Sequence, residues 1–264
     1  MIDGYKVVTI TPAGRIPFLE ILFPYLLQNR HVIDKHIFYL NPADDISRNY
    51  IISLGSRYKS FVEIIQGELP YNWWRSVYPM YKYCCDEDTI YIKIDDDVCY
   101  IGPDSIEKLV RFRIAHPEFF LVFPVIVNNN MDIPLGIETK SKFQDFLTCL
   151  SFGLEKHWKF FFHYPNYLEK FCKFDYMALP PQRIMINCVS WFGRDFAKFG
   201  GVVPEDDEVW LTIDKTADLR RQNAVTANAI VCHFAFSWQQ QIMAESGLLE
   251  EYKKLAPGTP IKMG

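Results

Sequence analysis

Three consecutive aspartates at positions 95 to 97 raise the first chemical question in the sequence. They follow TIYIKI at 89 to 94, whose alternating apolar and β-branched residues predict a buried strand. On an extended backbone, Asp95 and Asp97 point to one side and Asp96 to the other. Two convergent carboxylates form the hard oxygen site that Mg²⁺ or Mn²⁺ prefers. The alternative is a solvated turn whose carboxylates cap the helix expected near residue 104.

A histidine near the end of the chain is a second candidate metal ligand. His233 lies in NAIVCHFAF at 228 to 236, an apolar run that predicts a strand. Its imidazole can complete the coordination shell of a divalent cation. A lone histidine among apolar neighbours is, however, more often a satisfied core residue. Both interpretations therefore stay open for His233.

A second acidic cluster, EDDE at 205 to 208, precedes a predicted helix. Acidic residues at a helix start complement the macrodipole, which explains one or two of them more readily than four in succession. A carboxylate there can also accept the proton of an attacking hydroxyl group. The candidates are Asp206, Asp207 and Glu208, of which Asp207 is favoured.

Strands alternate with helices through the first half of the chain. Strands are predicted over 5–10, 35–40, 61–66, 89–94 and 119–127, and helices over 16–29, 47–58, 72–84 and 104–117. Pro24 should kink or split the first helix. The alternation predicts an α/β, Rossmann-like fold with a mixed, mostly parallel central sheet flanked by helices. Three polar loops, TPAGR, NPADD and the aspartates, follow strands of this sheet and should share its ligand-binding rim.

The second half is less regular, and no linker separates it from the first. Helices joined by a proline turn are predicted between 140 and 178, a strand over 183–193, a helix beginning in the acidic cluster, and the strand of His233. Residues 1–264 are therefore expected to form a single domain.

The composition excludes several functional classes. Hydrophobic residues make up 49% of the 264, charged residues 23%, and the formal net charge is −4. No run of Lys and Arg indicates nucleic-acid binding. No apolar run approaches the ~20 residues of a transmembrane helix, and no secretory signal is recognisable. Seven irregularly spaced cysteines predict reduced thiols and a cytoplasmic location.

The motifs, taken in order, resemble a known enzyme family. A T-P-x-G-R loop after the first strand, a strand followed by D-x-D, and a late strand carrying a histidine are similar to nucleotide-sugar-dependent glycosyltransferases of the GT-A fold. The resemblance spans about residues 5 to 241, although short segments carry it. It implies a nucleotide-sugar-binding half at about 1–127 and an acceptor-binding half at about 128–264. It also implies Mn²⁺ or Mg²⁺ and a donor that is most commonly linked to UDP.

The same resemblance implies roles for individual residues. Asp97 would bind the metal, His233 would complete its shell, and Asp95 would contact the donor ribose or the metal's water shell. The positions implied for donor binding are Thr11, Pro12, Ala13, Arg15, Asn41, Arg75, Asp95 and Asp96. Among the aspartates, Asp96 is expected to matter least to the metal. Trp191 would stack on an acceptor sugar and Asn187 would hold its hydroxyls, unless Trp191 is a core residue.

These roles describe a hexosyl- or pentosyltransferase that acts on a glycan or other hydroxyl acceptor. Inversion of configuration, with the acidic cluster as base, is the expected course, and retention is the alternative. Two other functions fit parts of the sequence. A metal-dependent phosphohydrolase would use the aspartates with water as nucleophile. A non-catalytic carbohydrate-binding module would use the abundant aromatic residues without metal or nucleotide. The oligomeric state is not indicated.

Overall fold

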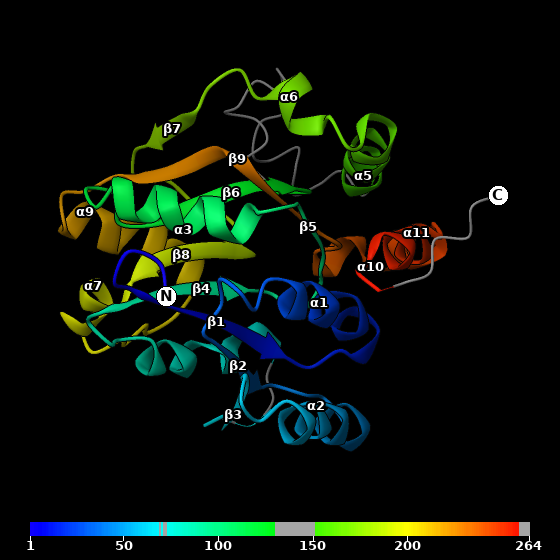
Figure 1. Ribbon diagram of the computed structural model, residues 1–264, viewed down its shortest axis with the longest axis horizontal. Coiled ribbons are helices and arrows are strands. Elements are labelled where there is room, and N and C mark those ends of the chain that lie inside the picture. Colours follow the sequence, from blue (N-terminus) through cyan, green and yellow to red (C-terminus); the bar gives the residue numbers. More distant parts are fainter. Residues whose placement is uncertain (69, 71–72, 130–150, 259–264) are drawn as a thin grey trace.

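The computed structural model describes residues 1–68, 70, 73–129 and 151–258, and a mixed sheet runs through them (Figure 1). Its strand order is β3-β2-β1-β4-β8-β6-β9-β5, with β7 also paired to β9. The strands are β1 (Lys6–Ala13), β2 (Lys35–Leu40), β3 (Val62–Gln66), β4 (Thr89–Ile94), β5 (Val98–Ile101), β6 (Val122–Val127), β7 (Tyr176–Leu179), β8 (Cys188–Phe192) and β9 (Asn223–His233). Helices flank this sheet, so the predicted α/β class is confirmed.

The first half of the chain builds the parallel part of the sheet. β1 pairs in parallel with β2 and β4, and β2 pairs in parallel with β3. Every residue of β4 is buried, which agrees with its almost uninterrupted apolar and β-branched sequence. Because these strands run in one direction, the loops that follow β1, β2 and β4 emerge at the same edge. The shared rim predicted for these loops is therefore present.

The helices of the first half differ from the predictions in two places. They are α1 (Ile16–Gln28), the 13-residue helix α2 (Asp45–Arg57), the 3₁₀ segments η1 (Trp73–Ser76) and η2 (Tyr78–Tyr83), and α3 (Ser105–Ala115). Pro24 was predicted to kink or split α1, and the split does not occur, because α1 is one helix with Pro24 inside it. Its buried apolar face, which packs beside β5, stabilises the helix on both sides of the proline. The aromatic segment at 73–83 forms 3₁₀ turns rather than the predicted α-helix.

The second half adds the antiparallel part of the sheet. β8 pairs antiparallel with β4 and β6, and β9 pairs antiparallel with β5 and β7. Its helical segments are α5 (Ser151–His163), α6 (Tyr167–Phe171), α7 (Gly193–Ala197), α8 (Asp207–Val209), the π-helical η3 (Trp210–Lys215), α9 (Thr216–Asp218), η4 (Ser237–Gln239), α10 (Gln240–Glu245) and α11 (Leu248–Leu255). The predicted helices near the proline turn correspond to α5 and α6; residues 140–150 lie outside the described residues.

Two strands, β5 and β7, were not predicted. Each has only four residues and pairs with β9, which is distant in sequence. Figure 1 shows β9 running beside β6, with α3 lying against this part of the sheet. Across the described ranges, no helix combines the length and the apolar character needed to span a bilayer.

Trp191 belongs to the core on β8. Its side chain is 0% exposed, and its ring stacks on Phe196 at a centroid distance of 4.6 Å and on Tyr91 at 6.0 Å. The indole Nε1 donates to the backbone oxygen of Cys84 at 3.3 Å, so its one polar group is satisfied internally. The prediction that Trp191 stacks on an acceptor sugar is therefore wrong, because both faces of β8 are covered.

Replacing this indole should affect stability. We expect Trp191→Ala to lower the free energy of unfolding by about 3–5 kcal/mol, because the large cavity left behind cannot close. The matched control is Trp158→Ala, whose side chain on α5 is 48% exposed and which should change stability by no more than about 0.5 kcal/mol. Chemical denaturation measures both, and equal losses in the two variants would contradict the core assignment.

Candidate functional site

A cavity of 590 Å³ opens at the edge where the parallel strands end. Strand-end loops, the start of α8 and the segment after β9 contribute to its wall. Among the described residues, the predicted positions that line it are Pro12, Arg15, Asn41, Asp95, Asp96, Asp97, Asn187, Asp206, Asp207, Glu208 and His233. The structure thus brings most of the predicted site residues together around one space.

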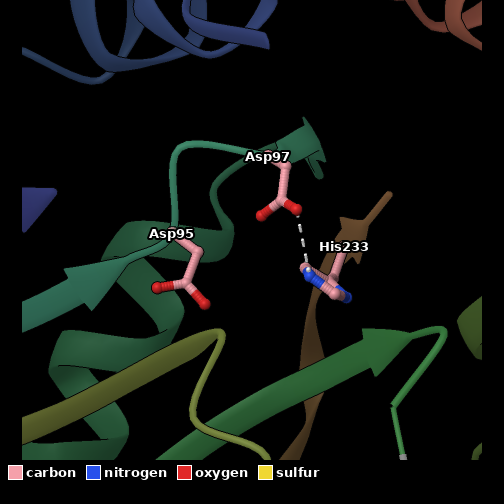
Figure 2. A group of neighbouring side chains, drawn as sticks. All are labelled: Asp95, Asp97 and His233. Carbon is pink, nitrogen blue, oxygen red and sulfur yellow. Dashed lines mark ion pairs between the residues drawn. The ribbon is translucent and has the colours of Figure 1, made fainter. Parts of the chain in front are cut away.

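Asp95, Asp97 and His233 form a compact group within this cavity (Figure 2). One ligand atom of each lies within 4.8 Å of the others, and His233 Nε2 is 3.4 Å from Asp97 Oδ2. Asp97 is 2% and His233 3% exposed. The pairing of β5 with β9 sets this arrangement, because Val98 is opposite His233 in the ladder.

Two polar atoms of this group are buried without a hydrogen-bond partner among the described residues. They are Asp97 Oδ1 and His233 Nδ1. A buried carboxylate oxygen that lacks a partner is costly, and a bound cation would remove that cost. Carboxylate oxygens and an imidazole nitrogen also suit Mn²⁺ or Mg²⁺. The residues present therefore fit a divalent cation, with Asp97 and Asp95 as its carboxylate ligands and His233 as its imidazole ligand.

Asp95 is held from both sides. Lys93 Nζ pairs with Asp95 Oδ1 and also donates to the backbone oxygen of Ile186 at 2.8 Å. Asn187 Nδ2 donates to Asp95 Oδ2 at 3.1 Å, and Asn129 Nδ2 donates to Asn187 Oδ1 at 2.8 Å. Asn187, which was predicted to hold acceptor hydroxyls, thus orients a carboxylate next to the candidate metal position.

Asp96 lines the same cavity but is not part of this group, and its hydrogen bonds go to the loop after β1. Its Oδ2 accepts from the backbone N–H of Gly14 at 3.0 Å and of Arg15 at 2.9 Å. Its Oδ1 accepts from Arg15 Nε at 3.0 Å, and Arg15 Nη2 pairs with both Asp96 and Asp97. Asp96 therefore connects the loop after β1 to the turn after β4.

The carboxylates of this turn titrate differently. Burial alone would raise the pKa of Asp97, but the charges of Arg15 and His233 outweigh burial and hold that pKa below its usual range. Burial is the largest influence on Asp96 as well, and there it prevails over Arg15, so the pKa of Asp96 is raised. Of Asp96 and Asp97, Asp97 is consequently the carboxylate that stays ionised more readily, as a metal ligand must.

The second acidic cluster faces the same cavity from α8. Tyr81 donates its hydroxyl to Asp207 Oδ2 at 2.8 Å, and burial raises the pKa of the Asp207 carboxyl. Arg183 lies 2.9 Å from Glu208 Oε2 and 3.3 Å from Asp206 Oδ2. Burial, followed by the charge of Asp207, raises the pKa of Glu208 to about 7, although Arg183 opposes the change. Such a group exchanges protons near neutral pH.

Three other predicted donor-binding residues are not among the described residues that line the cavity. Thr11 and Ala13 are 0% exposed within β1, where they support the loop from the core. Arg75 is exposed on η1. The predictions for Thr11 and Ala13 took the whole of TPAGR as a loop, whereas β1 continues to Ala13 and only the residues that follow it leave the sheet.

Sequence reasoning missed several cavity residues. Lys93 and Arg183 provide positive charge, and Phe236 and Trp238 provide a stacked aromatic pair with ring centroids 4.8 Å apart. The available signals were a lysine inside an otherwise apolar strand and two aromatic residues shortly after His233.

Negative charge dominates the described wall of the cavity. Its carboxylates are Asp95, Asp96, Asp97, Asp206, Asp207 and Glu208, whereas its cationic side chains are Arg15, Lys93 and Arg183. An anionic ligand such as a diphosphate would be repelled by this excess unless a cation accompanied it. The charge balance therefore agrees with the presence of a metal position beside Asp97.

Comparisons with known proteins identify the fold. The sequence matches no protein-family model and no curated protein. The mannosyltransferase PcManGT from Pyrobaculum calidifontis, in complex with GDP-Man and Mn²⁺, is similar in structure with a TM-score of 0.57 and 12% identity, over 97% of this chain and 67% of that one. GalNAc-T7 with UDP, GalNAc and Mn²⁺ gives a TM-score of 0.57 at 9% identity, over 95% of this chain and 49% of that one.

A nucleotidyltransferase fold is also similar. The 4-diphosphocytidyl-2C-methyl-D-erythritol synthase from Anaerococcus prevotii gives a TM-score of 0.51 at 12% identity, over 94% of this chain and all of that one. The predicted resemblance to GT-A glycosyltransferases is confirmed at the level of the fold. The chain thus has a glycosyltransferase-like enzyme fold that nucleotidyltransferases share.

The pKa of Glu208 leads to a stability prediction. In the folded chain the Glu208 carboxyl keeps its proton up to about pH 7, whereas an unperturbed glutamate carboxyl loses its proton near pH 4.5. Ionisation of Glu208 therefore lowers the stability of the fold progressively between pH 4.5 and pH 7. We expect the difference in the free energy of unfolding between Glu208→Gln and the wild type to grow in favour of the variant by about 3 kcal/mol over this pH interval. Above the interval the difference should stay constant. Denaturant unfolding in chelator-containing buffer measures the gain. Glu205→Gln, an exposed neighbour, is the control, and a difference that does not change with pH would contradict the assignment.

Proposed function

We propose that this protein is a metal-dependent glycosyltransferase that moves a sugar from a nucleoside-diphosphate donor to a hydroxyl group of a glycan or similar acceptor. The observation that supports this proposal most directly is that two clusters of charged side chains line the same cavity. Asp95, Asp97 and His233 fit a divalent cation, and the acidic cluster of α8 lines the same space. A transferase of this kind needs both: a cation for the diphosphate and a base for the acceptor.

The donor is proposed to lie over the ends of β1, β2 and β4. A divalent cation held there would neutralise charge on the departing nucleoside diphosphate. Arg15 would add a fixed positive charge beside the phosphates, while Pro12 and Asn41 would contact the nucleotide. We propose UDP as the nucleotide and residues 1–127 as the donor-binding half, with the acceptor contacting the remainder. Because Trp191 is buried, the acceptor contacts would come from other residues of the cavity wall.

The acceptor oxygen would attack the anomeric carbon while the bond from that carbon to the diphosphate oxygen breaks. The acceptor's proton would pass to a carboxylate of the acidic cluster, and the configuration would invert. We propose Asp207 as this base, because burial raises its pKa and the Tyr81 hydroxyl fixes its orientation. Arg183 would hold Glu208 and Asp206 in place beside it.

Nucleotidyl transfer is the second candidate, supported by the fold similarity to the Anaerococcus prevotii synthase. A nucleoside triphosphate carries more negative charge than a nucleoside-diphosphate sugar and would need more cationic side chains. The described wall carries twice as many carboxylates as cationic groups, which favours sugar transfer. Nucleotidyl transfer would release pyrophosphate from a triphosphate, whereas sugar transfer would release a nucleoside diphosphate.

Metal-dependent nucleotide binding tests the donor site. We expect one of UDP, GDP or CMP to raise the melting temperature of the wild type with Mn²⁺ and to have little effect in chelator. Asp97→Asn should lose this response because it removes an ionised ligand, while keeping its fold. Asp214→Asn, an exposed carboxylate on η3, should respond as the wild type does. A wild type insensitive to every nucleotide would refute the proposed donor site.

Single substitutions in the acidic cluster test the base. We expect Asp207→Asn to keep the Mn²⁺-dependent nucleotide response and to lower the transfer rate by about 10²–10⁴-fold, the usual cost of removing a general base. Asp206→Asn and Glu208→Gln should lower it less. Product formation from a radiolabelled donor measures the rates. If Glu208→Gln caused the largest loss, the base would be Glu208 instead.

A further inference from the structure

Asp96 has contacts that neither metal coordination nor donor binding requires. Its two oxygens accept hydrogen bonds from both backbone N–H groups of the Gly14–Arg15 dipeptide and from the Arg15 guanidinium. Its side chain is 6% exposed. The carboxylate therefore acts chiefly on the loop after β1, and through that loop on Arg15.

Arg15 is shared between two carboxylates. Its Nη2 pairs with Asp96 Oδ1 and lies 3.0 Å from Asp97 Oδ2. The other oxygen of Asp97, Oδ1, is buried without a hydrogen-bond partner among the described residues, and Asp97 belongs to the candidate metal group. The guanidinium and a divalent cation consequently compete for the negative charge of the same carboxylate.

The loop after β1 cannot relieve this competition by moving away from Asp97. A Cβ atom on Gly14 would lie 2.5 Å from the backbone oxygen of Asn41, so the chain is already in close contact with the loop after β2. Arg15 begins α1 as its N-cap residue, which fixes its backbone from the other side. The backbone of Arg15 is thus fixed, and its guanidinium, which lies 5.0 Å from the centre of the Phe18 ring, has Asp96 and Asp97 as its carboxylate partners.

We propose that Asp96 is a positioning residue that holds the Arg15 guanidinium and so keeps Asp97 available to a divalent cation. Without Asp96, the guanidinium would pair with Asp97 alone and weaken cation binding. This inference rests on the proposed function only for the presence of the cation. It gives Asp96 an important indirect role, although the alternation of the sequence suggested that it matters least to the metal.

Mn²⁺ binding in the absence of nucleotide tests the proposal. Isothermal titration calorimetry would be performed on the wild type, Asp96→Asn, Arg15→Ala and the double variant. Substitutions that disturb the partners of metal ligands lower metal affinity by about 10–100-fold, and we expect a loss in this range for Asp96→Asn. Arg15→Ala should improve the affinity more in the Asp96→Asn background than in the wild type, because only there is the guanidinium free to move onto Asp97.

A charge control separates positioning from the simple loss of a negative charge. Asp206→Asn removes a carboxylate from the same cavity without touching Arg15. In that background, Arg15→Ala should have the same effect as in the wild type. Equal effects of Arg15→Ala in all three backgrounds would overturn the proposal, as would wild-type affinity in Asp96→Asn. The thermal midpoint in chelator reports whether each variant folds.

The design remains decisive if Asp96→Asn does not fold. Arg15→Ala alone must then bind Mn²⁺ at least as tightly as the wild type, and a tenfold loss would overturn the proposal. Absence of Mn²⁺ binding by the wild type would overturn it too. The proposed function fails separately, since a wild type that binds Mn²⁺ but neither binds a nucleotide nor transfers a sugar would leave the role of Asp96 intact.

Discussion

The antiparallel pairing of β5 with β9 is the constraint on which the site depends. It places Val98 opposite His233, and the backbone N–H of Phe234 donates to the backbone oxygen of Asp97 at 2.9 Å. The turn after β4 is thereby fixed against the end of a strand from the other half of the chain. A carboxylate and an imidazole that are remote in sequence become neighbours on rigid elements, which gives a metal position its precision.

The charges around this contact explain how three adjacent aspartates can be tolerated at a strand end. Each has partners of its own, and Arg15 is shared by two of them. Lys93 and Asn187 hold Asp95, the backbone of the Gly14–Arg15 loop holds Asp96, His233 lies beside Asp97, and the Arg15 guanidinium pairs with both Asp96 and Asp97. Repulsion among the three is reduced by these partners, but the cavity as a whole keeps an excess of negative charge. A divalent cation would complete the balance and would also allow a diphosphate to approach.

The ligand-binding edge of the sheet could be predicted because the sequence patterns that mark it are local. A buried parallel strand has a clear apolar pattern, and the polar loops after β1, β2 and β4 necessarily meet at one edge. β5 was missed because four apolar residues after an acidic turn carry no periodicity, and their partner lies far along the chain. Trp191 was misassigned because the sequence of β8 does not show that both its faces are covered. The partners of Asp96 depend on the packing of two loops, which no spacing in the sequence encodes.

Anomalous diffraction from crystals of the protein soaked with Mn²⁺ would show whether a cation binds between Asp97 and His233. We expect a peak at the manganese absorption edge that is coordinated by Asp95, Asp97 and His233, and no such peak in Asp97→Asn crystals. A peak at another position, or continued coordination by His233 in the Asp97→Asn variant with no loss of occupancy, would contradict the proposed metal site.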